Sequence, residues 1–355
     1  MQLGHNEIMI VSKYFEDIND FINLEMGVKR FRGNMERFHF NPIPLNQYSR
    51  KLFPNIETFH IYNEKDEIFE DGRIFKQIIW YKVSYSRYLE EKKEMNEYKN
   101  IEYTEEDREE YGNTIPIEVT SLGNYCFYGC NDIQSIEIPT NVSKIGDGCF
   151  IGCTSLTTIN IPTSISEIGD SCFYKCTSLT SIEILTNINK IGYGCFEECE
   201  SLTSLTIEDV KYISEERIFM NEPVLISIEI PKNLKIINGK NIEKKDINKF
   251  IIPSSITKLG DYCFKGSTSL KSINIPTSIT YIGNRCFSEC STLTSINIPT
   301  NINKIGYGCF YDCTSLTSIN IPSTITSFGN KCFYGCGCEE ELKKNKTIPK
   351  NCFYI

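Results

Sequence analysis

Cysteine is the residue type in this chain whose number and spacing could do chemistry. The chain has 17 cysteines among its 355 residues, and every one follows position 125. Seven times a second cysteine stands four residues after a first, as in Cys126/Cys130 and Cys149/Cys153. Short spacings of this kind occur in zinc sites, where four ligands close on one ion. A cysteine with a base within hydrogen-bond reach could also act as a nucleophile.

The surrounding residues favour a structural role for these thiols. Ile218 and Ser267 replace cysteine at equivalent positions, which suits packing and removes a ligand. The three histidines, His5, His39 and His60, all precede the cysteines, and no triad, phosphate loop or metalloprotease motif is present. Disulfides are not expected, because the count is odd and no export signal is found. We therefore predict reduced, buried thiols, no metal, no cofactor and no enzymatic activity.

The charge and the first residues limit where the chain acts. A net charge of -9 and a pI near 5.2 argue against nucleic acid as a partner. The first apolar run, Ile8 to Val11, is too short for a signal peptide or a transmembrane segment. These features predict a cytoplasmic protein.

A repeat organises the chain from Ile115 onward. Its period is 23 residues, broken once by 22, and ten repeats between residues 115 and 343 predict a solenoid. The motif Leu-x-x-Ile-x-Ile alternates as a half-buried strand does, so stacked strands would form a parallel sheet. We expect a left-handed turn at the glycine in position 9, with Asn238 as its substitute in the sixth unit, and a continuous stack of the phenylalanines in position 13. The units begin at 115, 138, 161, 184, 207, 230, 252, 275, 298 and 321.

This pattern resembles the BspA-like, or Treponema-type, leucine-rich repeats of bacteria and parasitic protists. The resemblance implies a leucine-rich repeat solenoid with a parallel β-sheet on one face and short strands, turns and helical segments on the other. The residues before the repeats are expected to form an α+β cap at the N-terminus. The implied function is a non-enzymatic interaction scaffold that binds a protein, or a glycan, through the repeat face. A surface adhesin, as among bacterial relatives, is an alternative.

Positions 21 and 23 of the units should point out of the sheet and form a polar ladder. Such a ladder suits hydrogen bonding to a ligand, or these residues only keep the surface soluble. The irregular fifth and sixth units form a partner-specific patch or are decayed repeats, and the sequence favours decay. The candidate binding residues are Ser135, Glu137, Thr158, Asn160, Ser181, Glu183, Ser204, Ser272, Asn274, Ser295, Asn297, Ser318 and Asn320.

The residues before the repeats predict three segments. Residues 1–50 are expected to be helical; there Tyr14, Phe15, Phe21 and Leu24 resemble an F-box, which implies a substrate adaptor of a ubiquitin ligase. The alternative is a helical cap on the solenoid. Residues 51–100 should supply capping strands, at 53–62 and 78–86, with Trp80 in the core. Residues 101–114 are acidic and form a linker or a short helix.

The basic segment 344–355 ends in Cys352, Phe353, Tyr354 and Ile355. It is out of register with the repeat and matches a prenylation motif, which predicts attachment to anionic lipid at the cytoplasmic face of the plasma membrane. Some protist proteins of the resembled family carry such endings. In the alternative, Cys352 and Phe353 fold back to cap the last repeat. The sequence does not identify the ligand.

Overall fold

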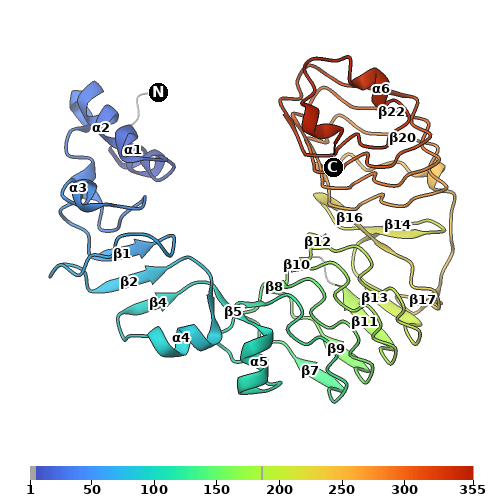
Figure 1. The fold of residues 1–355 in the computed structure, drawn as a ribbon, viewed down its shortest axis with the longest axis horizontal. Helices are drawn as coiled ribbons and strands as arrows, with labels where there is room; N and C mark the ends of the chain where they lie inside the picture. Colours follow the sequence, from blue (N-terminus) through green and yellow to red (C-terminus); the bar gives the residue numbers. More distant parts are fainter. Residues whose placement is uncertain (1–4, 185–186, 355) are drawn as a thin grey trace. The chain divides into compact units, whose positions relative to one another are not determined.

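The structure is a computed structural model that describes residues 5–184 and 187–354 (Figure 1). The chain forms two compact units. The N-terminal unit comprises Met1–Tyr103 with Glu118–Thr120, and the repeat unit comprises Thr104–Ile117 with Ser121–Ile355. Each unit is described by itself below.

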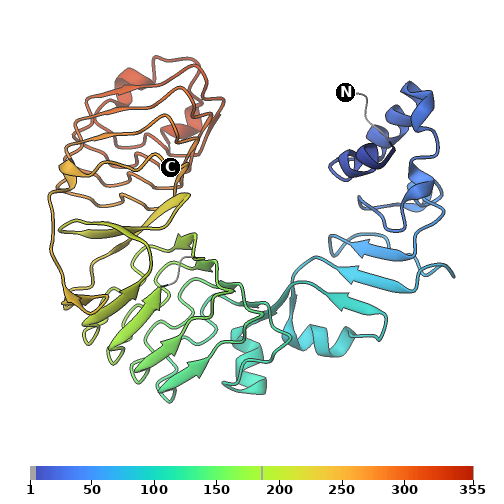
Figure 2. The ribbon, with the colours of Figure 1, turned by 180° about the vertical axis from the view of Figure 1, so that it is seen from behind.

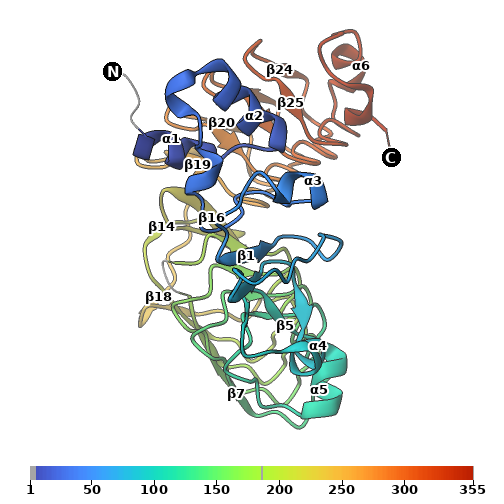
Figure 3. The same ribbon diagram turned by 90° about the vertical axis from the view of Figure 1, so that its left-hand side faces the viewer.

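Helices open the N-terminal unit, as the sequence predicts. α1 spans His5–Ser12, and α2 spans Ile18–Gly27, where the Asp17 side chain accepts hydrogen bonds from the backbone of Asn19 and Asp20. Short helices follow before the first strand, as Figure 3 shows. They are η1 (Lys29–Phe31), η2 (Met35–Arg37) and α3 (Gln47–Arg50).

Three strands of this unit pair in parallel: β1 (Thr58–Ile61), β2 (Lys76–Ile79) and β4 (Asn96–Tyr98). Their alternate side chains enter a core that also holds Phe21, Phe38 and Phe53. A strand within 53–62 is therefore confirmed. The segment 78–86 differs from the prediction, since it contains the end of β2, the short β3 (Val83–Ser84) and the start of α4 (Tyr85–Glu91).

The structure also tests the predictions for Trp80 and for the acidic segment 101–114. Trp80 is 40% exposed, so its predicted place in the core is wrong. It follows β2 at the point where alternation turns the side chain outward. The acidic segment contains β5 (Ile101–Tyr103) and, in the repeat unit, the helix α5 (Glu105–Tyr111). Thr104 and Asp107 form a capping box at the start of α5. Of the two alternatives for this segment, a linker or a short helix, the structure contains the helix.

The repeat unit stacks its turns through two series of short parallel strands, so the predicted solenoid is confirmed (Figure 2). The first series carries positions 21 to 23 of the units, and the second carries positions 7 and 8. The first series is β7 (Ser135–Glu137), β9 (Thr158–Asn160), β11 (Ser181–Ile184), β13 (Ser204–Ile207), β20 (Ser272–Asn274), β22 (Ser295–Asn297) and β24 (Ser318–Asn320). The second is β6 (Ser121–Leu122), β8 (Lys144–Ile145), β10 (Glu167–Ile168), β12 (Lys190–Ile191), β19 (Lys258–Leu259), β21 (Tyr281–Ile282), β23 (Lys304–Ile305) and β25 (Ser327–Phe328).

The glycine in position 9 serves close stacking, so the prediction of a left-handed turn there is wrong. These glycines do not have positive φ. A Cβ atom added to Gly192 would lie 2.3 Å from the backbone nitrogen of Asp170, and one added to Gly283 would lie 2.5 Å from the carbonyl carbon of Gly260. Successive turns of the chain therefore touch at this point. Asn238, in contrast, has φ of 52° and bonds through its side-chain amide to the backbone of Ile207.

The phenylalanines stack along the axis, but in two separate runs. Phe127, Phe150, Phe173 and Phe196 form one run, with ring centres 5.3 to 5.7 Å apart. Phe219, Phe264, Phe287, Phe310 and Phe333 form the other. Phe196 and Phe219 make no ring contact among the described residues, so the predicted continuous stack is wrong. The break falls between the fourth unit, which holds Phe196, and the irregular fifth unit, which holds Phe219.

The cysteines are all buried, as predicted. In five of the seven pairs the second thiol donates to the carbonyl oxygen of the phenylalanine one turn earlier; these thiols are Cys153, Cys176, Cys199, Cys290 and Cys313. The Sγ atom of Cys153 lies 3.0 Å from the oxygen of Phe127, and that of Cys313 lies 2.9 Å from the oxygen of Phe287. The described residues hold no group of three or more His, Cys, Asp or Glu side chains that could bind a metal ion.

The chain folds back over the last repeat at its end. After α6 (Glu339–Leu342), the helix η4 (Lys350–Cys352) places the carbonyl groups of Asn351 and Cys352 on the backbone nitrogens of Lys331 and Phe333. Cys352 is fully buried and Phe353 is 4% exposed. Helices long and apolar enough to cross a bilayer are absent from the part of the chain that the structure describes.

Candidate functional site

The predicted polar ladder lies on the outer side of the first strand series. Backbone pairing sets its register: Ser272, Ser295 and Ser318 lie side by side, and so do Asn274, Asn297 and Asn320. The N-terminal half pairs likewise, with Ser135 opposite Thr158 and Glu137 opposite Asn160, and with Ser181 opposite Ser204 and Glu183 opposite Thr206. Ser204 is half-buried, and the other predicted ladder residues are exposed.

The ladder side chains are not used by the fold. The side chains of the 13 predicted ladder residues form no hydrogen bond or ion pair with any other described residue. The threonines one position earlier differ, because Thr157 and Thr294 donate to carbonyl groups of the preceding turn. Neighbouring strands in a sheet lie about 4.8 Å apart, so the ladder presents hydroxyl and amide groups at a fixed interval. Such an array can form many hydrogen bonds to an extended partner.

The ladder is interrupted at the fifth and sixth units, where strands change sheets. β16 (Val224–Glu229) pairs with β19 of the second series, and β17 (Ile236–Ile237) pairs with β13 of the first. β14 (Val210–Ile213) and β15 (Arg217–Met220) join β16 in antiparallel pairing, and β18 (Lys240–Asn241) follows β17. We call residues 207–251 the junction. It is an ordered structure with its own pairing, although the sequence favoured a decayed pair of repeats.

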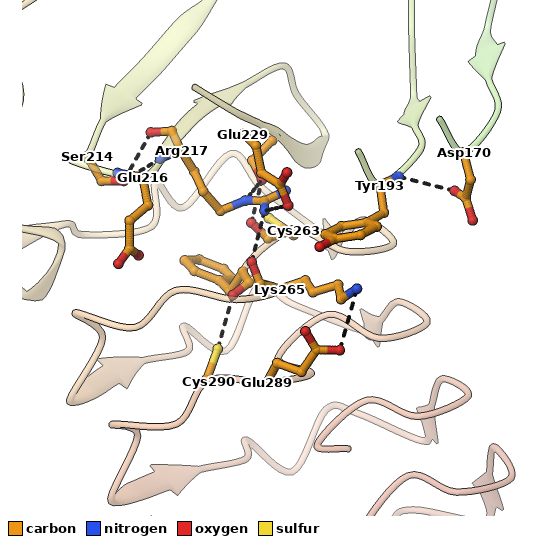
Figure 4. Close-up of polar contacts among 12 residues, drawn as sticks. Asp170, Tyr193, Ser214, Glu216, Arg217, Glu229, Cys263, Lys265, Glu289 and Cys290 are labelled. Atoms are coloured by element: carbon orange, nitrogen blue, oxygen red, sulfur yellow. Dashed lines mark hydrogen bonds and ion pairs between the residues drawn. The ribbon is translucent and has the colours of Figure 1, made fainter. Parts of the chain in front are cut away.

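A buried arginine holds the junction to the next repeat (Figure 4). Arg217 is 2% exposed; its Nε donates to Oγ of Ser227 at 2.7 Å, and one Nη donates to the carbonyl oxygen of Lys265 at 2.8 Å. The same Nη lies 3.2 Å from the carboxylate of Glu229. Ser227 in turn donates to the carbonyl oxygen of Cys263. Ser227 occupies a ladder position by its place in the unit, but this network turns it inward.

A second set of contacts joins the two runs of repeats beside this network. The Nζ atom of Lys265 lies 3.2 Å from the centre of the Tyr193 ring and 3.5 Å from a carboxylate oxygen of Glu289. Burial lowers the pKa of Lys265, although Glu289 opposes the shift. The Tyr262 hydroxyl donates to Asp170 at 2.9 Å, and burial raises the pKa of Tyr262. These side chains come from both sides of the junction.

A pocket of about 890 Å³ opens between the fourth unit and the junction. Its wall includes the buried Arg217, and its charged lining is acidic on balance. The added charged residues of the fifth and sixth units are visible in the sequence and mark this region as unusual. The number of charged residues alone does not predict a pocket. The charged residues in the lining are Glu197, Glu198, Glu200, Arg217, Glu229 and Lys232.

The remaining predicted site residues are the F-box-like residues near the N-terminus and the lipidation site near the C-terminus, and they differ in exposure. Of the F-box-like residues, Tyr14 is 82% exposed, Phe15 and Leu24 are half-buried, and Phe21 lies fully inside the core of the N-terminal unit. The predicted lipidation site, Cys352, is buried; a hydrogen bond with Cys332 lowers the pKa of Cys352. Its placement matches the alternative in which the tail caps the last repeat.

Comparison with known proteins gives one family and several solved structures. A family model described as "BspA type Leucine rich repeat region (6 copies)" matches residues 112–222 and 214–339. No curated protein matches the chain. Among solved structures, a leucine-rich repeat protein of Bacteroides ovatus is 21% identical, over 72% of this chain and 82% of its own, with a TM-score of 0.26.

Two other structures have a similar level of likeness. The leucine-rich repeat protein of T. pallidum is 21% identical, over 69% of this chain and 83% of its own, with a TM-score of 0.25. A leucine-rich cell surface protein of Faecalibacterium prausnitzii is 20% identical, over 79% of this chain and 86% of its own, with a TM-score of 0.34. Likeness at this level carries no conclusion about function. The family model spans well over half of the residues, and the chain belongs to the BspA-type leucine-rich repeat family.

Proposed function

We propose that the chain is a non-enzymatic scaffold that binds a protein partner along the polar ladder of its first strand series. The observation that supports this function is the uncommitted ladder: its side chains are exposed, held in register by backbone pairing, and free of side-chain partners among the described residues. Because backbone pairing fixes the spacing of these groups, one partner can form hydrogen bonds to several turns at once. Proteins of this family are typically repeat scaffolds, which agrees with this role.

The junction pocket can supply an anchoring point for the same partner. Interfaces derive most of their affinity from a few side chains seated in pockets, with the rest supplying complementarity. The acidic balance of the lining favours a basic side chain of the partner. A partner that extends along the ladder strands and places a lysine or arginine here would use both features.

Two other functions predicted from the sequence have weaker support. An F-box-type adaptor would need its apolar contact residues at the surface, whereas Phe21 is part of the core. A prenyl tether would need the thiol of Cys352 to be accessible, whereas that thiol is fully buried and η4 is hydrogen-bonded to the last repeat. A glycan as the ladder's ligand remains compatible with the same hydroxyl and amide groups, and the experiment below distinguishes it from a protein.

The test places positive charge on the ladder. We expect the triple variant Ser272→Lys, Ser295→Lys, Ser318→Lys to lose its bound protein, because three lysines side by side block hydrogen bonding and repel a basic partner. The measurement is affinity enrichment with the full chain and quantitative mass spectrometry, followed by a binding titration with the purified partner.

The chain offers a matched control in three consecutive units, the eighth to the tenth. Thr280→Lys, Asn303→Lys and Thr326→Lys add the same charges at exposed positions beside the second strand series. This control should retain the partner. Equal retention by both variants, or equal loss, would show that the ladder does not hold the partner. Loss of binding after deglycosylation of the partner would assign the contact to a glycan.

A further inference from the structure

Aromatic side chains gather in a pocket of the N-terminal unit, away from the ladder in sequence. The pocket has a volume of about 290 Å³ and is lined by Lys13, Phe40, Pro42, His60, Tyr62 and Trp80. The rings of Phe40 and His60 are stacked, with centres 5.0 Å apart, and Trp80 lies 5.8 Å from His60. Trp80 is 40% exposed and is the only tryptophan of the chain. We call these residues the aromatic platform.

The hydrogen bonds around His60 define what the platform can accept. The Tyr62 hydroxyl donates its proton to the carbonyl oxygen of Asn41 at 2.8 Å. The contact of 3.3 Å between Nδ1 of His60 and that hydroxyl oxygen therefore requires Nδ1 to carry the proton. Burial lowers the pKa of His60, which keeps the ring neutral at pH 7. Its Nε2 is then an acceptor that has no partner among the described residues.

A cation stands at the edge of the platform. The Nζ atom of Lys13 lies 5.4 Å from the centre of the Phe40 ring, and Lys13 is exposed. No carboxylate of the described residues forms an ion pair with it, in contrast to Lys99, which lies over Trp80 but is paired with Glu97. A ligand on the platform therefore meets a flat apolar surface, a hydrogen-bond acceptor and an uncompensated positive charge.

We infer that the aromatic platform binds an acidic sugar, a hexuronic acid residue of a polysaccharide. A pyranose ring has an apolar face that can stack on Trp80, hydroxyl groups that can donate to Nε2 of His60, and a carboxylate that can pair with Lys13. The pocket, at about 290 Å³, lies just below the range of about 300 to 1,000 Å³ that is typical of ligand pockets, so it suits a single ring. A methylated ammonium group is disfavoured by Lys13, and a peptide would need several residues to supply what one uronic acid ring supplies.

The test uses the full chain and tetragalacturonate as the probe. Trp80 is the sole tryptophan, so a saturable change in its fluorescence reports occupation of the platform directly. The comparison probes are the neutral galactose tetramer, which lacks the carboxylate, and tetraglutamate, which has the charge without the ring. We expect tetragalacturonate to bind more tightly than the galactose tetramer, and tetraglutamate not to change the fluorescence.

Three variants locate the binding. Lys13→Gln should weaken tetragalacturonate binding about fivefold, as the loss of one exposed ion pair does. Trp80→Ala, followed by calorimetry because the fluorophore is gone, should weaken it about tenfold or more. Phe75→Ala removes another exposed aromatic side chain of the same unit outside the platform and should leave binding unchanged.

Three results of this experiment would contradict the proposed binding of a hexuronic acid. Absence of saturable binding of tetragalacturonate, a response to tetraglutamate of equal strength, or full binding by Trp80→Ala would each overturn the inference. The ladder variant with Ser272, Ser295 and Ser318 changed to lysine should bind the sugar normally, so this result is independent of the proposed protein scaffold.

Discussion

At the scale of single residues, the thiols show how one amino-acid type is used in two ways. The first cysteine of a pair, such as Cys172, lies beside its equivalents Cys149 and Cys195 in the adjacent turns. The second, such as Cys176, donates to a phenylalanine carbonyl one turn earlier. Cysteine combines a small apolar side chain with a weak donor, which fits both places. Burial is the largest cause of the raised pKa of Cys153, Cys176 and Cys199.

A labelling experiment follows from this burial. Burial raises the pKa of Cys153, Cys199 and Cys290 to about 12. Since the thiolate is the reactive form, we expect these three residues to resist iodoacetamide at pH 8 in the folded protein and to react fully after denaturation. Mass spectrometry of tryptic peptides measures the extent at each position. Rapid labelling of the native chain at these cysteines would contradict the buried placement.

At the scale of elements, the junction occupies the place of two regular units and contains a polar network. Its strands exchange sheets, and the groups left without regular stacking are bonded by Arg217. Buried polar groups must be satisfied, because each unsatisfied donor or acceptor costs about 1 to 3 kcal/mol. A single arginine with several donors meets this requirement at the point where the repeat pattern fails.

Removing this arginine should therefore weaken the fold. We expect Arg217→Met to lower the free energy of unfolding by about 2 to 4 kcal/mol, because the carbonyl of Lys265 and the hydroxyl of Ser227 lose their donor. Urea denaturation measures the change. Lys144→Met is the control: Lys144 pairs with Glu167 at the surface, at 3.3 Å, and its loss should cost less than about 1 kcal/mol. Equal effects of the two variants would show that the network is not structural.

At the scale of the whole molecule, each turn of the repeat unit depends on its neighbours. The core that begins at Phe219 extends through the last repeats to Phe353, and among the described residues it includes no side chain of the first four units. In repeat proteins, stability is approximately a sum of local terms between adjacent repeats. The two runs of phenylalanines are therefore expected to respond separately to a local defect.

Hydrogen exchange can follow such a defect along the chain. Phe287→Ala should lower the stability of the C-terminal run by about 3 to 5 kcal/mol, because it removes a ring stacked between Phe264 and Phe310. Amides of β20 to β24 should then exchange faster, while those of β8 and β10 keep their protection. Phe150→Ala is the matched variant and should give the opposite pattern. Faster exchange along both runs in either variant would show that the repeat unit unfolds as one.

The sequence alone determined the solenoid, its strand series and the exposed ladder, because a period of 23 residues specifies contacts between equivalent positions of adjacent turns. The same reasoning identified the helices before residue 30 and the strand at β1. It mistook the role of Gly192, since a pattern does not show whether φ or close contact excludes a side chain.

Only the tertiary structure decided the features that depend on contacts outside the period. Asp170 and Tyr262 are 92 positions apart and meet because strands exchange sheets at the junction. Cys352 is out of register, so its burial depends on how the tail folds over the last turn. In each case the partner lies at a separation that the repeat does not encode, and packing in three dimensions selects it.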